Sequence, residues 1–290
     1  MTYTLQFYGA TEQVTGSLYV VRTARHTVLL ECGLVQGGRA EEERNSDPFP
    51  VPIDEIDAVI VSHAHIDHSG RLPLLVSRGY EGPIYTQHAS KALCEIMLPD
   101  SGYLNEKDVE WENKRRQKNG KPLLEPLYTR ADAESSLTQI DSIDYEQATE
   151  ILPGLVLTFH DAGHILGSSI VELTCIENAE ERTLVFSGDL GYRDAPVMNP
   201  PVRLTKADAV VMESTYGDRL HRSWEDSINE FHDVLNNATS GKGNILIPAF
   251  AVGRTQEILY LMAQNFEEWN LDRWLIFLDS PMAIEATRIF

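Results

Sequence analysis

The stretch of sequence that decides the fold runs from residue 58 to residue 70 and reads AVIVSHAHIDHSG. Its first four residues form a continuous apolar run, which predicts a buried strand. His63 and His65 follow at the end of this strand, and their spacing of two sends both side chains to the same face. Asp67 and His68 come next, in a turn that opens a helix. Four such side chains would be costly to crowd together without a cation, and three imidazoles with one carboxylate suit zinc.

Two more candidate ligands follow predicted strands further along the chain. His164 comes directly after Gly163, and Asp189 comes directly after Gly188. The glycines let the backbone turn tightly, as a site at the edge of a sheet requires. Either residue alone would be interpreted as an ordinary turn residue. Together with the first motif, they predict one shared metal centre.

The remaining chain alternates between strand-like and helix-like segments. Expected strands cover 4–8, 17–22, 27–31, 58–61, 83–86, 154–159, 168–174, 183–186, 209–212, 244–248 and 274–278, and expected helices cover 71–78, 90–98, 106–119, 223–236, 253–265 and 283–290. From residue 209 onward, strands and helices alternate, which is typical of a parallel sheet. The sequence therefore predicts an α/β protein.

Composition restricts the possible functions. The chain has 290 residues, 42% of them hydrophobic and 23% charged, which predicts one large or two smaller folded domains. Its 24 basic and 44 acidic residues give a formal charge of −20. This balance excludes a broad basic surface for phosphates, so a polyanionic substrate must be held locally. No apolar run is long enough to span a bilayer, and the N-terminus carries no secretory signal.

The cysteines and one basic cluster carry less information. Cys32, Cys94 and Cys175 lie far apart without a CxxC motif, which fits a reducing cytoplasm and small buried residues. The basic cluster comprises Lys114, Arg115, Arg116, Lys118 and Lys121. It is either a solvated helix face beside acidic neighbours or a lid helix that touches substrate.

These ligand motifs resemble those of the metallo-β-lactamase superfamily. The resemblance implies an αββα sandwich with two zinc ions. His63, His65 and His164 would hold one zinc, Asp67 and His68 the other, and Asp189 would bridge them. A hydroxide shared by the two zinc ions would be the nucleophile. A histidine at position 65 favours zinc and hydrolysis over redox chemistry, because the di-iron branch carries glutamate there.

Three later blocks resemble the β-CASP branch of RNA- and DNA-cleaving enzymes. They are VMESTYGDR at 211–219, IPAFAVGRTQE at 247–257 and LDSPMA at 278–283. The closest subgroup resembles bacterial and archaeal relatives of the cleavage and polyadenylation endonuclease. By this resemblance, residues 1–215 form the metallo-β-lactamase domain and residues 216–290 the first part of a Rossmann-like β-CASP domain. Asp67 and Glu213 would be catalytic residues.

The block at 247–257 also suggests a contact with substrate. Backbone N–H groups of Gly253, Arg254 and Thr255 could point at a phosphate at a helix N-terminus, and Arg254 could add a bidentate contact. The alternative is an ordinary turn between a strand and a helix.

Two departures from the family pattern stand out. Glu31 occupies a position before Cys32 where the family usually has aspartate, and this side chain supports ligands rather than binding metal. The family also has two histidines after the β-CASP region, one a partner of Glu213 and one completing the second zinc site. The chain ends before either, so we expect a shortened form. We expect it to keep the first zinc better than the second and to have impaired activity.

The sequence therefore predicts a zinc-dependent hydrolase that cleaves phosphodiester bonds of single-stranded RNA in the cytoplasm. No membrane partner is expected, and homo-oligomers are possible because sheet edges promote association. One alternative is a hydrolase of small esters, thioesters or lactones, against which the three β-CASP-like blocks argue. Another is a non-catalytic partner in RNA processing. The presence of all six expected ligands argues against it; they are His63, His65, Asp67, His68, His164 and Asp189.

Overall fold

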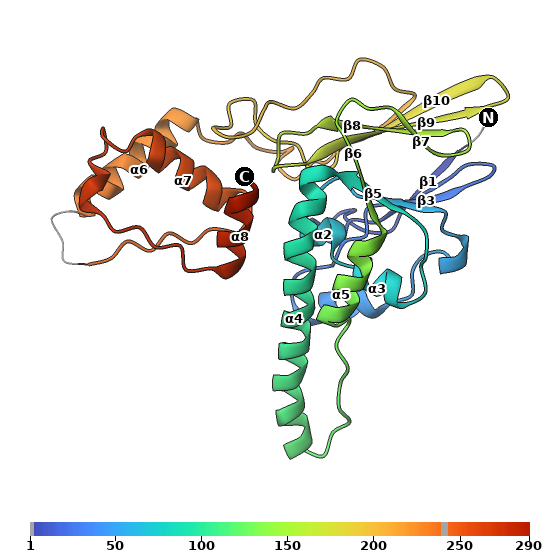
Figure 1. The fold of residues 1–290 in the computed structure, drawn as a ribbon, viewed down its shortest axis with the longest axis horizontal. Coiled ribbons are helices and arrows are strands. Elements are labelled where there is room, and N and C mark those ends of the chain that lie inside the picture. The colour runs from blue at the N-terminus through green and yellow to red at the C-terminus, as the bar shows by residue number, and fades with distance from the viewer. Residues whose placement is uncertain (1–2, 239–242) are drawn as a thin grey trace.

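A computed structural model describes residues 3–238 and 243–290. Two sheets pack face to face, and helices cover the outer face of the first sheet (Figure 1). The strands are β1 Thr4–Phe7, β2 Tyr19–Arg22, β3 Thr27–Leu30, β4 Ala58–Ile60, β5 Ile84–Gln87, β6 Ile140–Ile143, β7 Thr149–Leu152, β8 Leu155–Asp161, β9 Ser169–Glu177, β10 Glu180–Phe186 and β11 Ala209–Val211. The α-helices are α1 Arg39–Glu42, α2 Ile66–Ser69, α3 Leu72–Ser77, α4 His88–Lys118, α5 Arg130–Ser136, α6 Trp224–Ala238, α7 Arg254–Gln264 and α8 Pro281–Ile289.

The order of the strands brings several strand ends to one edge. The first sheet has the order β1-β2-β3-β4-β5-β6, antiparallel from β1 to β3 and parallel from β3 to β6. The second sheet has the order β11-β10-β9-β8-β7, and only β10 and β11 pair in parallel. The segments that follow β4, β8 and β10 carry the six predicted metal ligands, and Glu213 follows β11.

Alternation along the strands divides the core into two layers. In β3, Val28 and Leu30 face the second sheet, where they pack with Phe159 of β8. Leu29 lies on the other face, in a cluster that includes Leu72 of α3 and helix α4. The outer face of the second sheet carries the extended segment 187–208 rather than a helix layer, within the part of the chain that the structure describes (Figure 1).

Most of the helices and strands predicted from the sequence are confirmed, and so is the α/β sandwich. One difference is α4, where two helices were expected at 90–98 and 106–119. The structure has one helix that continues through Pro99 and projects far from the sheets (Figure 1). Its N-terminus is fixed by the Gln87 side chain, which accepts a hydrogen bond from the N–H of Ala89 at 2.6 Å.

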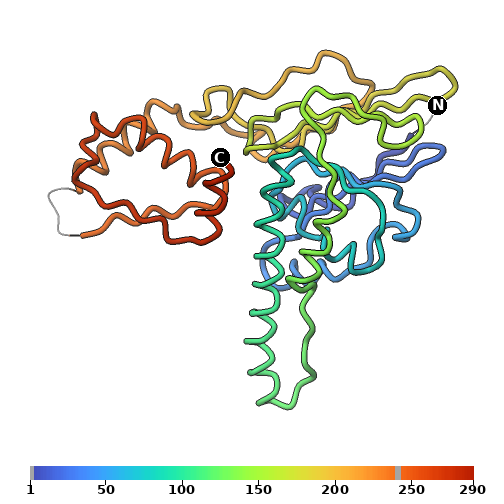
Figure 2. Tube along the Cα trace, in the orientation of Figure 1, coloured from blue at the N-terminus to red at the C-terminus, as the bar shows by residue number. Residues whose placement is uncertain are grey.

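The segment after β11 forms a lobe beside the N-terminal half of α4 (Figure 2). Val252 and Ala286 join the core cluster around α4, so the lobe is anchored by apolar contacts. The strands expected at 244–248 and 274–278 are wrong, because both stretches are extended but belong to none of the described sheets. Apolar sequence alone does not make a strand without a hydrogen-bonding neighbour. Leu246 is 89% exposed and Phe277 82% exposed accordingly.

Candidate metal centre

Three histidine rings converge where β4 and β8 end. His63 and His65 follow β4, and His164 lies in the loop after β8. Nδ1 of His65 lies 3.0 Å from Nε2 of His63 and 3.2 Å from Nε2 of His164. Together with a carboxylate oxygen of Asp189, one atom from each side chain falls within 4.8 Å of the others. The structure thus brings together four of the six predicted ligands around one point.

The glycines beside these ligands permit the close approach. Gly163 has a φ of +66° and Gly188 a φ of +53°, which are left-handed conformations that favour glycine. A side-chain carbon at Gly188 would lie 2.8 Å from Oγ of Ser62 in the loop after β4. The two loops can therefore meet only because this position lacks a side chain.

Ring nitrogens of three neutral histidines face one another, which supports a metal-binding role for the cluster. Burial lowers the pKa of His63 well below its usual value and that of His65 to about 3, and it lowers the pKa of His164 as well. The rings are therefore neutral, and each carries one N–H. Nδ1 of His63 lies 2.9 Å from Oγ of Ser62, which leaves Nε2 for the centre. Neutral imidazole nitrogens with a carboxylate are a donor set that suits a borderline divalent cation.

Asp189 faces both groups of histidines. Its Oδ2 lies 3.5 Å from Nε2 of His164 and 3.8 Å from Nε2 of His63, whereas its Oδ1 lies 3.4 Å from Nε2 of His68. Burial raises the pKa of this carboxyl, but His68 and the neighbouring histidines outweigh burial and lower it to about 2. The ionised carboxylate has one oxygen on each side, which is the position expected for a ligand shared by two metals.

Asp67 and His68 lie on the side of Asp189 that is opposite to His63 and His164. Oδ2 of Asp67 is 3.8 Å from Nε2 of His68. Burial raises the pKa of Asp67. Burial also lowers the pKa of His68, but the carboxylates of Glu31 and Asp189 outweigh this and raise it well above its usual value. In contrast to the first three histidines, His68 is therefore a cation whenever no metal competes for its nitrogen.

Glu31 contacts the loop after β4 and the ring of His68 from the protein interior. Its side chain is fully buried, Oε1 accepts a hydrogen bond from the N–H of Ser62 at 2.8 Å, and Oε2 lies 3.0 Å from Nδ1 of His68. The residue has a φ of +66°, a conformation that side-chain-bearing residues seldom adopt. The longer glutamate reaches both partners, so it orients His68 while leaving Nε2 directed at Asp67 and Asp189.

Glu213 connects the metal loop to the segment after β11. Its carboxylate accepts hydrogen bonds from the N–H groups of Leu190 and Thr215, at 3.2 Å and 3.1 Å. Its own N–H donates to Oγ of Ser187 at 3.0 Å. The charge of Glu213 also raises the pKa of His164, although burial outweighs it. Glu213 thus lies beside the centre and fixes the loop that carries Asp189.

The three residues predicted to contact phosphate, 253–255, differ in how accessible they are to a ligand. The N–H of Gly253 donates to Oε1 of Gln256 at 2.7 Å, and Thr255 is buried with its hydroxyl donating to the carbonyl of Phe250. Arg254 is exposed and pairs with Glu257 at 2.9 Å. These contacts leave Arg254 as the better-placed group for a ligand.

The basic cluster on α4 lies far from the centre. Oγ of Ser90 donates to the carbonyl of Gly167, so α4 begins beside the metal loop. Lys114 follows twenty-four residues later, which corresponds to about 36 Å of helix. Lys114 pairs with Glu110 at 2.9 Å and Arg115 with Glu112 at 3.5 Å. The arrangement agrees with a solvated helix face and not with a lid over the centre.

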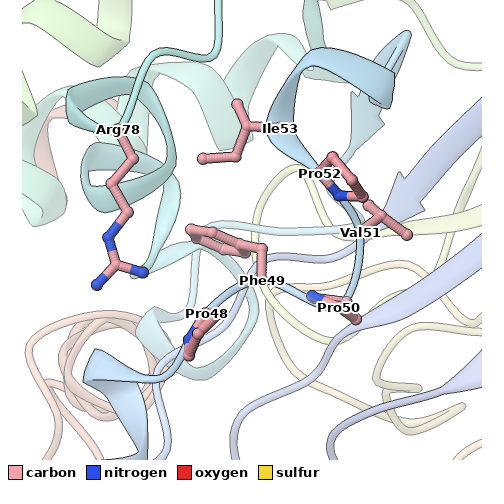
Figure 3. A pocket seen from close by; sticks show the side chains of 7 residues that line it. All are labelled: Pro48, Phe49, Pro50, Val51, Pro52, Ile53 and Arg78. Carbon is pink, nitrogen blue, oxygen red and sulfur yellow. The ribbon is translucent and has the colours of Figure 1, made fainter.

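Other residues outside the centre have structural roles. Cys32, Cys94 and Cys175 are free and buried, as predicted. His160 lies between Glu146 and Glu172, at 2.9 Å and 3.1 Å. A hollow of about 410 Å³ is lined by residues 48–53 and Arg78, and none of the predicted site residues reaches it (Figure 3).

Comparisons with known proteins define the class. The sequence model of the metallo-β-lactamase superfamily matches residues 12–236. The chain belongs to this superfamily. Within residues 3–238 and 243–290, no helix is both long and apolar enough to cross a membrane.

Three relatives narrow the comparison. Ribonuclease TTHA0252 of Thermus thermophilus is 40% identical over 95% of this chain and 58% of its own length. Transcription termination factor FttA of Methanosarcina mazei is 32% identical over 97% of this chain and 42% of its own length. Cleavage and polyadenylation specificity factor 73 of Drosophila melanogaster is 30% identical over 90% of this chain and 35% of its own length. The chain thus spans roughly a third to somewhat over half of these curated relatives.

Proposed function

We propose that this chain is a zinc-dependent hydrolase that cleaves phosphodiester bonds of single-stranded RNA in the cytoplasm. The observation that carries the proposal is Asp189, which has one oxygen towards His63 and His164 and the other towards His68. One of the relatives is named a ribonuclease, and another is named a cleavage and polyadenylation specificity factor. The match to the superfamily and the three later sequence blocks support the same branch.

In this proposal the ligands form two groups. His63, His65 and His164 would hold one zinc, Asp67 and His68 would hold the other, and Asp189 would contribute to both groups. Bound zinc supplies Lewis-acid polarisation and acidification of water near neutral pH. Residues 1–215 form the metallo-β-lactamase domain, and residues 216–290 belong to a β-CASP domain. Homo-oligomers are compatible with this arrangement.

The chain's own residues prepare the site for an anionic substrate. The first three imidazoles are neutral, so they donate electron pairs without competing protons. Glu31 holds the ring of His68 so that Nε2 faces Asp67 and Asp189. Glu213 holds the backbone after Asp189, and Arg254 is exposed for contact with a phosphate. Asp67 and Glu213 are the proposed catalytic carboxylates.

The test compares substrates and one pair of variants. Zinc-loaded protein is incubated with end-labelled unstructured RNA and with a generic thioester, with and without chelator. We expect chelator-sensitive RNA cleavage and no thioesterase activity. His164→Ala should abolish cleavage, whereas His88→Ala, an exposed histidine paired with Asp144, should retain it. Thioester hydrolysis without RNA cleavage would instead establish a small-molecule hydrolase, and zinc-dependent RNA binding without cleavage would establish a non-catalytic partner.

A further inference from the structure

A row of aromatic rings lies beside the metal centre. The centroid of Tyr216 is 4.3 Å from that of His221, which is 4.8 Å from Tyr192, and Tyr192 is 6.5 Å from Trp224. Each neighbouring pair meets edge to face, at interplanar angles of 68°, 75° and 78°. An edge-to-face contact covers only one face of one ring. The row therefore retains ring faces for a further partner.

The row is accessible and has a cation at each end. Tyr192 is 39% exposed and Tyr216 is 55% exposed, although both are large apolar rings. The guanidinium of Arg219 lies 5.8 Å from the ring centroid of Tyr216, and that of Arg254 lies 5.9 Å from the ring centroid of Trp224. Each guanidinium is paired with a neighbouring carboxylate at 2.9 Å, but both arginine side chains are more than half exposed, at 63% and 53%. Their remaining N–H groups are therefore accessible to a phosphate or a base, in a chain whose formal charge is −20.

The row is tied to the centre through the backbone. Tyr192 follows Asp189 by three residues, and Tyr216 follows Glu213 by three residues. Both loops are held by the carboxylate of Glu213, which accepts hydrogen bonds from Leu190 and Thr215. Trp224 and Arg254 come from the starts of α6 and α7. Three stretches of the chain, at residue 192, at 216–224 and at residue 254, thus place rings and cations next to the metal loop.

We propose that Tyr192, Tyr216, His221 and Trp224 form a stacking platform for unpaired bases of single-stranded RNA. This inference rests on the proposed function and adds how the substrate strand is held. Aromatic rings stack on any base, and guanidinium groups contact both bases and phosphates. The platform would therefore bind RNA with little sequence preference and would exclude a rigid duplex, whose bases are already stacked.

The test is a double-mutant cycle between a ring and a base. Fluorescent single-stranded RNA and a series with one abasic nucleotide at successive positions are bound to zinc-loaded protein, and anisotropy is read before products appear on a gel. Removing one stacked base should weaken binding about ten-fold. Tyr216→Leu should weaken binding to intact RNA by a similar factor. Its affinity should not fall further when the RNA lacks the base that stacks on Tyr216, because that contact is already absent. Tyr192→Leu should do the same at a neighbouring position, and Tyr216→Phe should restore binding.

Tyr103→Leu is the matched control. Tyr103 on α4 is 44% exposed and has Nζ of Lys107 at 5.6 Å from its ring, so it reproduces an exposed tyrosine with a cation. We expect unchanged RNA binding for this variant. Equal losses from abasic RNA in wild type and both leucine variants would overturn the platform and leave the ribonuclease proposal intact. Coupled losses without cleavage would support the platform and refute the ribonuclease. No binding by the wild type would overturn both.

Discussion

Glu31→Gln is the most informative single change, because it removes a charge without removing volume. The carboxylate offers two acceptors, one to the N–H of Ser62 and one to His68. A glutamine offers one acceptor and one donor. If its oxygen keeps the N–H of Ser62, its amino group faces Nδ1 of His68, which must then carry its proton on Nε2. A protonated Nε2 cannot donate an electron pair to a metal.

The magnitudes follow from these contacts. A buried hydrogen bond to a charged group contributes about 1.5–3 kcal/mol, so the metal-free variant should unfold with a free energy lower by about that amount. Loss of a carboxylate that orients a ligand costs about 10–100-fold in metal affinity. We expect this loss for the zinc proposed at Asp67 and His68. Binding of the zinc proposed at His63, His65 and His164 should be as in the wild type.

Competitive chelator titration and chemical denaturation in chelator measure the two effects. Glu172→Gln is the matched control, because it makes the same change beside the buried ring of His160, away from the metal ligands. Glu31→Asp keeps the charge and should fall between wild type and Glu31→Gln. If Glu31→Gln bound both zinc ions with wild-type affinity and lost no stability, the assigned role of Glu31 would be wrong.

Three further predictions address the metals, pH and the long helix. Chelator titration of the wild type should show one tightly held zinc and one weaker zinc, and two equally tight ions would contradict the expected difference between the two ligand groups. In chelator, the melting temperature should fall as the pH drops below about 6.5. The pKa values of His63, His65 and His164 are lowered in the folded protein, so the unfolded chain binds more protons and gains stability relative to the folded one. The raised pKa of His68 acts in the opposite direction, but it offsets only one of these three histidines. A melting temperature that stays constant between about pH 7 and pH 5 would argue against neutral imidazoles. Replacing Lys118 and Lys121 by glutamine should change kcat/KM for RNA less than two-fold, and a ten-fold loss would restore the lid interpretation. Lys118 ends the helix about 42 Å along from Ser90, and Lys121 lies in the turn that follows, where its N–H donates to the carbonyl of Arg116.

The sequence predicted the metal cluster because its information is local. His63 and His65 lie at the end of an apolar strand, and His164 and Asp189 lie next to glycines that permit tight turns. Parallel and adjacent strands end at the same edge, so ligands at strand ends meet with little dependence on the rest of the fold. The family resemblance, rather than this reasoning, assigned Glu31 a supporting role, and only the structure shows it between Ser62 and His68.

Features that depend on distant neighbours could not be predicted in this way. The segments 244–248 and 274–278 have strand-like composition, yet strand formation depends on a hydrogen-bonding partner that composition does not specify. The continuous helix through Pro99 was missed because proline usually ends a helix. The aromatic row was missed for a related reason, since Tyr192 and the stretch from Tyr216 to Trp224 are separated in sequence and meet only through tertiary contacts.

The contacts of Glu213 explain why the metal loop and the aromatic row should act together. One carboxylate holds the N–H of Leu190, next to Asp189, and the N–H of Thr215, next to Tyr216. A shift of either loop would therefore break a hydrogen bond to the same group and leave a polar atom unsatisfied. Because Asp189 faces both groups of histidines, its loop must already be fixed before metals or substrate can be placed. The lobe after β11 thus contributes to the geometry of the centre even though it supplies none of the six predicted metal ligands.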